Sequence, residues 1–306
     1  MKCLVTGASG FIGRGLSPAL REAGCDVLPL SRRGATLPDG TPTHALDLTG
    51  KLPADLFADV DVVIHLAGIA HQRARPDEYA ALNETATLAL ARTAAAAGVR
   101  RFIYVSSVKA MGNSPFSAPR NEEDVVVPGD AYGRSKWRAE RALLRQCRQS
   151  SMCLTILRPA LVYGAGVKGN LRLLARWARM GLPRPPPGGK RSMIALNDLH
   201  ALLLSLAGSS VLDTQTFIAC SQDYSAREVY DALRLASGAS TGRSWLPRWG
   251  WRAGTGLYDA LGQGEDSFDK LFGTELYDNA RVIAQTDWRP RVSLQDCAPS
   301  LLSDPA

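Results

Sequence analysis

A serine, a tyrosine and a lysine stand at a spacing that suits proton transfer. Ser107 closes an apolar run, Tyr132 follows 25 residues later, and Lys136 comes four residues after the tyrosine. Because positions i and i+4 share one face of a helix, Lys136 can lie beside the Tyr132 hydroxyl and lower its pKa. Such a phenol can give or take a proton at a carbinol or carbonyl oxygen, to which Ser107 can also hydrogen-bond. These residues are the predicted catalytic group, and an ordinary surface pair of tyrosine and lysine is the alternative.

A glycine-rich turn, TGASGFIG at residues 6–13, joins a predicted strand at Lys2–Thr6 to a predicted helix at Gly13–Ala23. Glycines let the backbone approach a pyrophosphate, while the helix N-terminus offers free N–H groups and a positive dipole end. A strand before and a helix after are the context that a dinucleotide-binding turn requires, and a plain glycine turn is the alternative. The predicted cofactor contacts here are Gly7, Gly10, Phe11, Ile12 and Gly13.

The end of the second predicted strand, Asp26–Leu30, bears on the choice of cofactor. NAD-specific sites place an acidic residue there to hold the ribose 2′-hydroxyl. This chain instead has Ser31, Arg32 and Arg33. Because arginine binds phosphate through charge-assisted, often bidentate hydrogen bonds, these residues favour NADP(H) over NAD(H). A solvent-facing basic turn is the alternative.

Short apolar runs alternate with helical patterns through the first half of the chain, which indicates a parallel sheet covered on both faces. The predicted fold is α/β, a Rossmann-type doubly wound parallel sheet with a smaller C-terminal α/β substrate domain. We expect the dinucleotide-binding domain at 1–164 and mainly the substrate domain at 165–306, with segment 193–222 packing back onto the first. The other strands expected in the sheet are Val60–His65, Arg101–Ser106, Met152–Leu157 and Thr216–Cys220.

Composition excludes several classes of protein. The chain has 306 residues, 45% of them hydrophobic and 21% charged, which is ordinary for a globular protein. The formal charge of +7 is not gathered in one basic run, so we expect no nucleic-acid partner. No Cys or His pair has metal-ligand spacing, so no metal site is predicted. The absence of a signal peptide and of a membrane-length apolar run predicts a cytoplasmic protein without membrane insertion.

Four motifs in order, TGASGFIG, HLAG (65–68), VSS (105–107) and YGRSK (132–136), resemble the extended short-chain dehydrogenase/reductase family of nucleotide-sugar epimerases, dehydratases and reductases. The resemblance implies that Tyr132 and Lys136 also contact the cofactor, Lys136 at the nicotinamide ribose. It implies a homodimer formed through two helices, at Glu84–Ala97 and Tyr132–Gln149. Further cofactor contacts implied in this way are Asp47, Leu48, Ala67, Gly68 and Pro159.

The same resemblance implies a nucleotide diphosphate sugar as the substrate, bound by the C-terminal half. Asn170 and Arg191 match positions near the diphosphate, and Ser107 would contact the sugar. Sugar dehydratases carry Asp-Glu after the catalytic Ser or Thr, but here Val108-Lys109 follow Ser107, which argues against dehydration. The predicted function is NAD(P)-dependent reduction of a nucleotide-linked 4-keto-6-deoxy sugar or amino sugar. The alternatives are a 4-epimerase using bound NAD, and a non-catalytic binding or regulatory protein.

Overall fold

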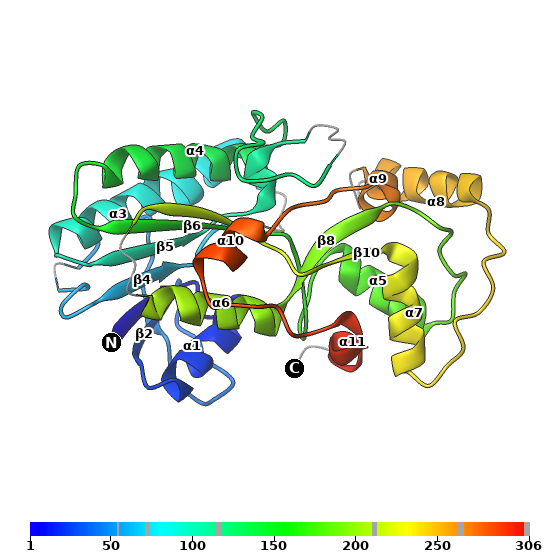
Figure 1. Ribbon diagram of the computed structural model, residues 1–306, viewed down its shortest axis with the longest axis horizontal. Helices are drawn as coiled ribbons and strands as arrows, with labels where there is room; N and C mark the ends of the chain where they lie inside the picture. The colour runs from blue at the N-terminus through cyan, green and yellow to red at the C-terminus, as the bar shows by residue number, and fades with distance from the viewer. Residues whose placement is uncertain (54, 71–73, 114–117, 210–212, 262–265, 303–306) are drawn as a thin grey trace.

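The computed structural model describes residues 1–306 except 54, 71–73, 114–117, 210–212, 262–265 and 303–306. Within these residues, seven parallel strands form one sheet in the order β3-β2-β1-β4-β5-β6-β9 (Figure 1). The chain winds outward from β1 in both directions, which confirms the predicted doubly wound Rossmann fold. The strands are β1 (Lys2–Thr6), β2 (Asp26–Ser31), β3 (His44–Ala45), β4 (Val62–His65), β5 (Arg101–Val105), β6 (Cys153–Pro159) and β9 (Gln215–Ala219).

Helices cover both faces of this sheet, and all residues of β4, β5 and β6 are buried. On one face, α1 (Gly13–Glu22) and α6 (Leu196–Gly208) pack against a core that includes Val5. On the other face, α3 (Thr87–Ala96) and α4 (Ala131–Cys147) pack against a core that includes Leu4. Neighbouring residues of β1 therefore serve opposite cores, because successive side chains of a strand point to opposite faces.

The helix expected at Glu84–Ala97 begins earlier in the structure. Three consecutive helical segments run through residues 76–96: α2 (Pro76–Tyr79), the π-helix η1 (Ala80–Ala86) and α3. Pro76 stands at the first helical position, and Glu78 accepts a hydrogen bond from the Arg75 N–H at 2.8 Å. Proline at that position and an acid in the first turn both favour a helix start, so the start signal was present in the sequence.

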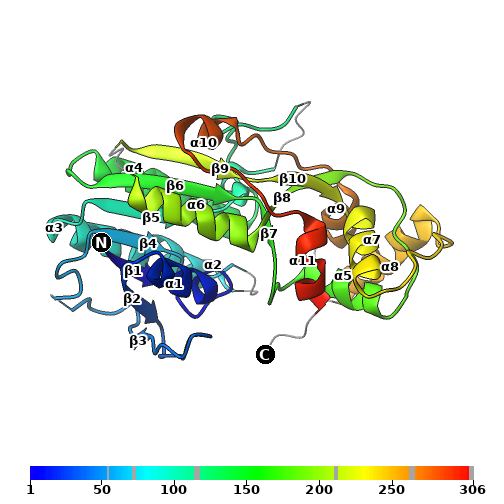
Figure 2. The same cartoon turned by 60° about the horizontal axis from the view of Figure 1, so that its bottom comes forward.

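A second, three-stranded sheet forms the centre of a smaller lobe among the described residues. Its strands are β7 (Leu161–Tyr163), β8 (Lys190–Ala195) and β10 (Gln222–Ser225); β8 pairs parallel with β7 and antiparallel with β10. The helices whose side chains complete its core are α5 (Asn170–Arg179), α7 (Ala226–Ala236) and α11 (Leu294–Leu302). Helix α8 (Arg248–Ala260) lies at the outer end of this lobe in both views (Figures 1 and 2), and α9 (Ser267–Phe272) packs against it.

The segment 193–222 crosses between the two lobes. It leaves the small sheet at the end of β8, enters α6, and then forms β9 at the edge of the large sheet. Leu199, Leu202 and Leu203 of α6 and Phe217 of β9 are buried in the same core as α1. After β9, the short helix α10 (Ala280–Gln285) also returns to this core through Val282. No helix in the described part of the chain is long and apolar enough to cross a membrane.

Candidate active site

The glycine turn lies between the carboxyl end of β1 and the start of α1, where the sheet order reverses direction. Gly7 has a φ of +67°, and a Cβ there would lie 2.8 Å from the Ala67 nitrogen. A Cβ on Gly13 would lie 2.4 Å from the Gly7 oxygen, so only glycine lets α1 begin so close to the turn. Gly10, at the tip, is exposed. The turn is therefore bare backbone at a helix N-terminus, which fits the pyrophosphate of a dinucleotide.

The two arginines after β2 are exposed, whereas Ser31 is buried. The hydroxyls of Ser31 and Thr43 form a hydrogen bond of 2.6 Å, and the Ala35 N–H donates to Thr43 Oγ1 at 2.8 Å. Ser31 thus holds the turn that presents Arg32 and Arg33.

Of the predicted cofactor contacts Asp47 and Leu48, one is likewise exposed and the other buried. Leu48 is buried in the core on the α3 face, while Asp47 is exposed. Hydrogen bonds from the Thr49 N–H and hydroxyl, and then the charge of Arg32, lower the pKa of Asp47. The charge effect indicates that Arg32 and Asp47 lie near each other at this end of the site.

An asparagine that the sequence analysis did not single out fastens the segment after β4. Asn83, buried within η1, accepts a hydrogen bond from the Ile69 N–H at 2.9 Å and donates to the Ile69 carbonyl at 3.1 Å. It also donates to Ser135 Oγ at 2.9 Å. A Cβ at Gly68 would lie 3.0 Å from the Asn83 Oδ1 and 3.4 Å from the Lys136 Nζ. The Asn83 side chain therefore joins the 67–69 segment to α4, and a π-helical turn at this point is typical of a functional site.

His65, the last residue of β4, has a structural place behind this segment. Its two ring nitrogens lie 2.7 Å from Thr6 Oγ1 and 2.8 Å from Thr87 Oγ1. Burial, with the positive charge of Lys136, lowers the pKa of His65 to about 3. The imidazole is therefore neutral at physiological pH and ties β1, β4 and α3 together.

Ser107, Tyr132 and Lys136 gather at the carboxyl end of β5 and the start of α4. Asp130 caps α4 by accepting a hydrogen bond from the Gly133 N–H at 2.8 Å, which places Tyr132 in the first turn. Burial raises the pKa of Tyr132 to about 12, against the opposing effect of its hydrogen bond with Ser107. Lys136 is buried one turn later and donates to the Val105 carbonyl at 3.0 Å.

The expectation that Lys136 lowers the pKa of Tyr132 is wrong for this arrangement. The Lys136 ammonium is directed to the Val105 carbonyl and lies 4.7 Å from the centre of the Tyr104 ring. Burial lowers the pKa of Lys136 to about 8 while it raises that of Tyr132, because both charged forms lose solvation. Desolvation therefore decides the direction of the Tyr132 shift, and the effect that opposes it comes from Ser107 and not from Lys136.

A buried ion pair lies behind these residues, on the same face of α4. Arg158 donates from Nη2 to Glu140 Oε2 at 2.7 Å and from Nε to Glu140 Oε1 at 3.1 Å. Its Nη1 donates to the Glu122 carbonyl at 2.9 Å. The pair fixes the end of β6, where the next residue is the buried Pro159, and the negative charge of Glu140 opposes the fall in the pKa of Lys136.

The substrate side contains a cluster of charges that the sequence did not predict. The guanidinium of Arg191 in β8 donates to the carboxylate of Glu275 and, at 2.8 Å, to the Asp269 carbonyl. Glu275 also accepts from Lys109 Nζ at 3.0 Å and from the Tyr277 hydroxyl at 2.8 Å. Burial would raise the pKa of Glu275, but the charges of Lys109 and Arg191 outweigh it and keep the carboxyl ionised.

This cluster joins the two lobes, because Lys109 lies in η2 (Val108–Met111), directly after Ser107, and Arg191 lies in the small sheet. Arg191 is thus close to the predicted catalytic group but already paired with an anion. Asn170, the exposed first residue of α5, takes no part in these hydrogen bonds.

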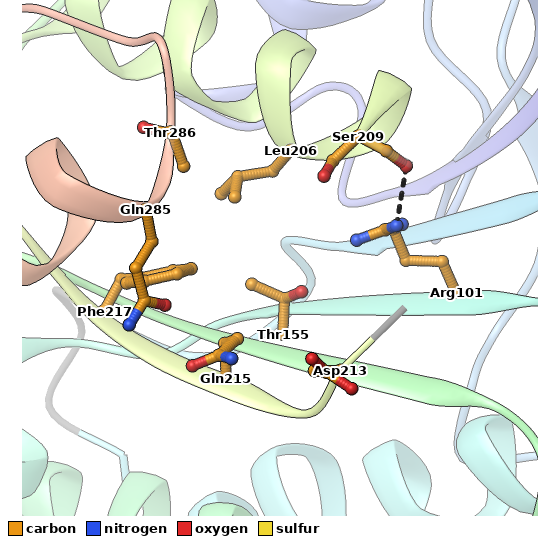
Figure 3. A pocket seen from close by; sticks show the side chains of 9 residues that line it. All are labelled: Arg101, Thr155, Leu206, Ser209, Asp213, Gln215, Phe217, Gln285 and Thr286. Carbon is orange, nitrogen blue, oxygen red and sulfur yellow. Dashed lines mark hydrogen bonds between the residues drawn. The ribbon is translucent and has the colours of Figure 1, made fainter. Parts of the chain in front are cut away.

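A separate pocket lies at the opposite edge of the large sheet (Figure 3). Arg101 and Gln215, the first residues of β5 and β9, line it, and Arg101 donates to the Ser209 carbonyl at 2.8 Å. The glycine turn and Tyr132 lie at the carboxyl ends of the strands, so this pocket is not part of the candidate site. In the part of the chain that the structure describes, no three His, Cys, Asp or Glu side chains come together as a metal site.

Comparisons with known proteins agree with this geometry. The family model described as the NAD dependent epimerase/dehydratase family matches residues 3–187. A UDP-glucose 4-epimerase of Vibrio cholerae is 31% identical over 305 residues, covering 96% of this chain and 92% of that protein. A dTDP-6-deoxy-L-talose 4-dehydrogenase (NAD(P)(+)) of Kitasatospora kifunensis is 29% identical over 203 residues, covering 65% of this chain and 63% of that protein.

The fold is also shared with a solved structure. The crystal structure of UDP-glucuronic acid 4-epimerase from Bacillus cereus in complex with NAD has a TM-score of 0.79 at 20% identity, covering 98% of this chain and 97% of that one. Together with a family model that spans more than half of the chain, these matches confirm the resemblance found in the motifs. The chain belongs to the NAD dependent epimerase/dehydratase family and is an enzyme of the extended short-chain dehydrogenase type.

Proposed function

We propose that this enzyme reduces a nucleotide-linked 4-keto-6-deoxy sugar or amino sugar at carbon 4, in the synthesis of a surface polysaccharide. One observation carries the proposal: Tyr132 lies beside the Ser107 hydroxyl and is protonated at neutral pH, as an unperturbed tyrosine would be, and burial raises its pKa further, to about 12. A protonated phenol beside a second hydroxyl suits proton delivery to a carbonyl oxygen, which is the acid half of a reduction. The relative from K. kifunensis, a 4-dehydrogenase, supports chemistry at the same carbon.

Epimerisation at carbon 4 is the second candidate, because the V. cholerae relative that matches nearly the whole chain is a UDP-glucose 4-epimerase. An epimerase oxidises and re-reduces one carbon with a cofactor that stays bound, whereas a reductase exchanges its cofactor in each turnover. A non-catalytic role is disfavoured, since Ser107, Tyr132 and Lys136 are all present and lie together.

The nicotinamide cofactor would supply or accept the hydride. The turn formed by Gly7, Gly10 and Gly13 would bind its pyrophosphate, and Arg32 and Arg33, both exposed, would bind a 2′-phosphate. Lys136 holds the carboxyl end of β5 through Val105, and its positive charge would favour the nicotinamide ribose hydroxyls as hydrogen-bond partners.

The diphosphate of the substrate would bind where Lys109 and Arg191 meet. These two cations now share the carboxylate of Glu275, so a diphosphate must compete with that carboxylate for them. Such an exchange of anions uses the same donors, because Arg and Lys bind phosphate and carboxylate oxygens through the same N–H groups.

The reductase proposal is tested by product analysis. We expect the purified enzyme to oxidise one equivalent of NADPH for each UDP-linked 4-keto-6-deoxyhexosamine consumed, measured by absorbance and mass spectrometry. Conversion of UDP-glucose to UDP-galactose without added reductant would instead establish the epimerase. Activity with neither class of nucleotide sugar would exclude both candidates.

Tyr132→Phe should lower kcat by roughly 10²–10⁴-fold, because it removes the proton donor, while cofactor affinity stays nearly unchanged. Steady-state kinetics and fluorescence titration with the cofactor measure the two effects. Tyr163→Phe is the matched control, because its hydroxyl donates to the Val292 carbonyl in the smaller lobe and makes no hydrogen bond with Ser107 or Lys136 in the described residues. Near-wild-type turnover by Tyr132→Phe would remove the catalytic assignment.

The wild-type enzyme should bind NADPH more tightly than NADH, and Arg32→Asp or Arg33→Asp should abolish that preference by repelling the 2′-phosphate. Fluorescence titration with both cofactors gives the ratio of dissociation constants. Arg148→Asp, at the exposed C-terminal end of α4, makes the same charge change elsewhere and should leave the ratio unaltered. A wild-type preference for NADH would contradict the proposal.

Arg191→Ala should raise KM for the nucleotide sugar more than it lowers kcat, because it removes ground-state binding. Glu275→Gln should act oppositely and tighten binding of free UDP, measured by calorimetry, since the competing anion is neutralised. Tyr277→Phe removes one hydrogen bond to Glu275 but no charge, and should leave UDP affinity unchanged. If Arg191→Ala impaired reduction of a phosphate-free ketone equally, Arg191 would have a structural role alone.

A further inference from the structure

An apolar stripe faces solvent along helix α8 at the outer end of the smaller lobe. Trp249, Ala253, Leu257 and Leu261 recur at four-residue spacing, which places them on one side of the helix. Trp249 is 74% exposed, Leu257 63% and Leu261 67%. Trp245, just before the helix, is 69% exposed. We call these five residues the outer stripe. Two tryptophans this exposed are unusual on a surface that meets only water.

The buried side of α8 fixes which side of the helix faces solvent. Trp251 is buried, with its ring centre 5.0 Å from that of Trp177 in α5 and 5.6 Å from that of Phe272 in α9. Because this anchor belongs to the core side of the helix, the outer stripe cannot turn inward without exposing Trp251. The stripe is therefore a fixed outward face.

Positive charge borders the outer stripe. Arg243, Arg248 and Arg252 are all exposed, and the guanidinium carbons of Arg248 and Arg252 lie 5.7 Å and 5.1 Å from the centre of the Phe268 ring. Within residues 239–261 the one acid is Asp259, whose carboxylate accepts hydrogen bonds from the Ser267 N–H and hydroxyl. Acids do occur at the adjoining α9: Asp266, the residue just before it, and Asp269 within it are exposed together with Lys270.

We infer that the outer stripe docks on an anionic membrane surface. A helix with tryptophan and leucine on one side and arginine beside them lies in the plane of a bilayer interface, where indole rings occupy the headgroup level. Arginine adds attraction to anionic lipid headgroups. A second copy of the chain is a poorer occupant, because pairing two stripes would bring their arginines together. This attachment places the enzyme at a membrane without a spanning helix.

The proposal is tested by sedimenting the full-length enzyme with vesicles. Vesicles of phosphatidylcholine containing phosphatidylglycerol should carry the protein down, and pure phosphatidylcholine should do so much less. Trp249→Ser/Leu257→Ser should weaken the lipid partition coefficient by roughly tenfold or more, since interfacial binding scales with buried apolar area. Arg248→Gln/Arg252→Gln should weaken it by roughly 25-fold at low salt, at about fivefold per charge.

The control Lys51→Gln/Arg148→Gln removes two exposed charges from the larger lobe and should leave partition unchanged. Thermal unfolding and cofactor binding confirm that each variant is folded. If the outer-stripe variants do not fold, a blue shift of wild-type tryptophan fluorescence with anionic vesicles supports docking, and no shift overturns it.

Three other outcomes would overturn the inference. The first is wild-type protein that stays in solution with anionic vesicles. The second is a concentration-dependent dimer lost in Trp249→Ser/Leu257→Ser without any lipid binding, which would assign the stripe to a second copy. The third is a raised KM for the nucleotide sugar in that variant, again without lipid binding, which would assign the stripe to the substrate.

Discussion

The buried ammonium of Lys136 is the contact on which the arrangement of the site depends. It donates to the carbonyl of Val105 at the end of β5, and it lies beside Gly68 in the segment that follows β4. It therefore positions α4 against two neighbouring strands at the edge where parallel strands place their ligands. Burying an ammonium is costly, and the fall of the Lys136 pKa to about 8 records that cost. The nearby carboxylate of Glu140 reduces this cost.

Glu140 is itself held by a buried ion-pair partner, so the side chains with fixed contacts extend inward from the site. Arg158 makes a forked contact with Glu140 and also donates to the Glu122 carbonyl. Glu122 in turn accepts from the Ile218 N–H in β9 at 2.8 Å. Removing one partner of such a pair leaves an uncompensated charge, typically at about 3–5 kcal/mol. Hydrogen bonds of Glu140, Arg158 and Glu122 thus tie α4 to the ends of β6 and β9 behind the predicted catalytic residues.

The substrate side follows a different principle. Lys109 from the larger lobe and Arg191 from the smaller lobe converge on Glu275, so an ion cluster joins the two lobes beside the apolar core that Ile194 of the small sheet shares with the large sheet. Such a cluster can rearrange when another anion enters, because its attractions are not specific to a carboxylate. The Ser107–Tyr132 pair adjoins this charged cluster, while the residues behind it are held by buried hydrogen bonds.

The sequence by itself determined the Rossmann fold, the glycine turn and the predicted Ser107, Tyr132 and Lys136 group. These features depend on short-range patterns: apolar runs of strand length, glycines at fixed spacing, and an i, i+4 pair on one helix. The sequence could not show that Leu48 and Ser31 are buried, because burial depends on which distant segment packs against each side chain.

The tertiary structure alone decided the electrostatics. Asn83 contacts Ile69 and Ser135, and Glu275 contacts Lys109 and Arg191 across 166 and 84 residues of chain. The direction of the Tyr132 pKa shift was also decided there, since it depends on desolvation as well as on spacing. The strength of a charge interaction depends on the distance between the charges and on their access to water. The separation of two residues along the chain gives neither quantity.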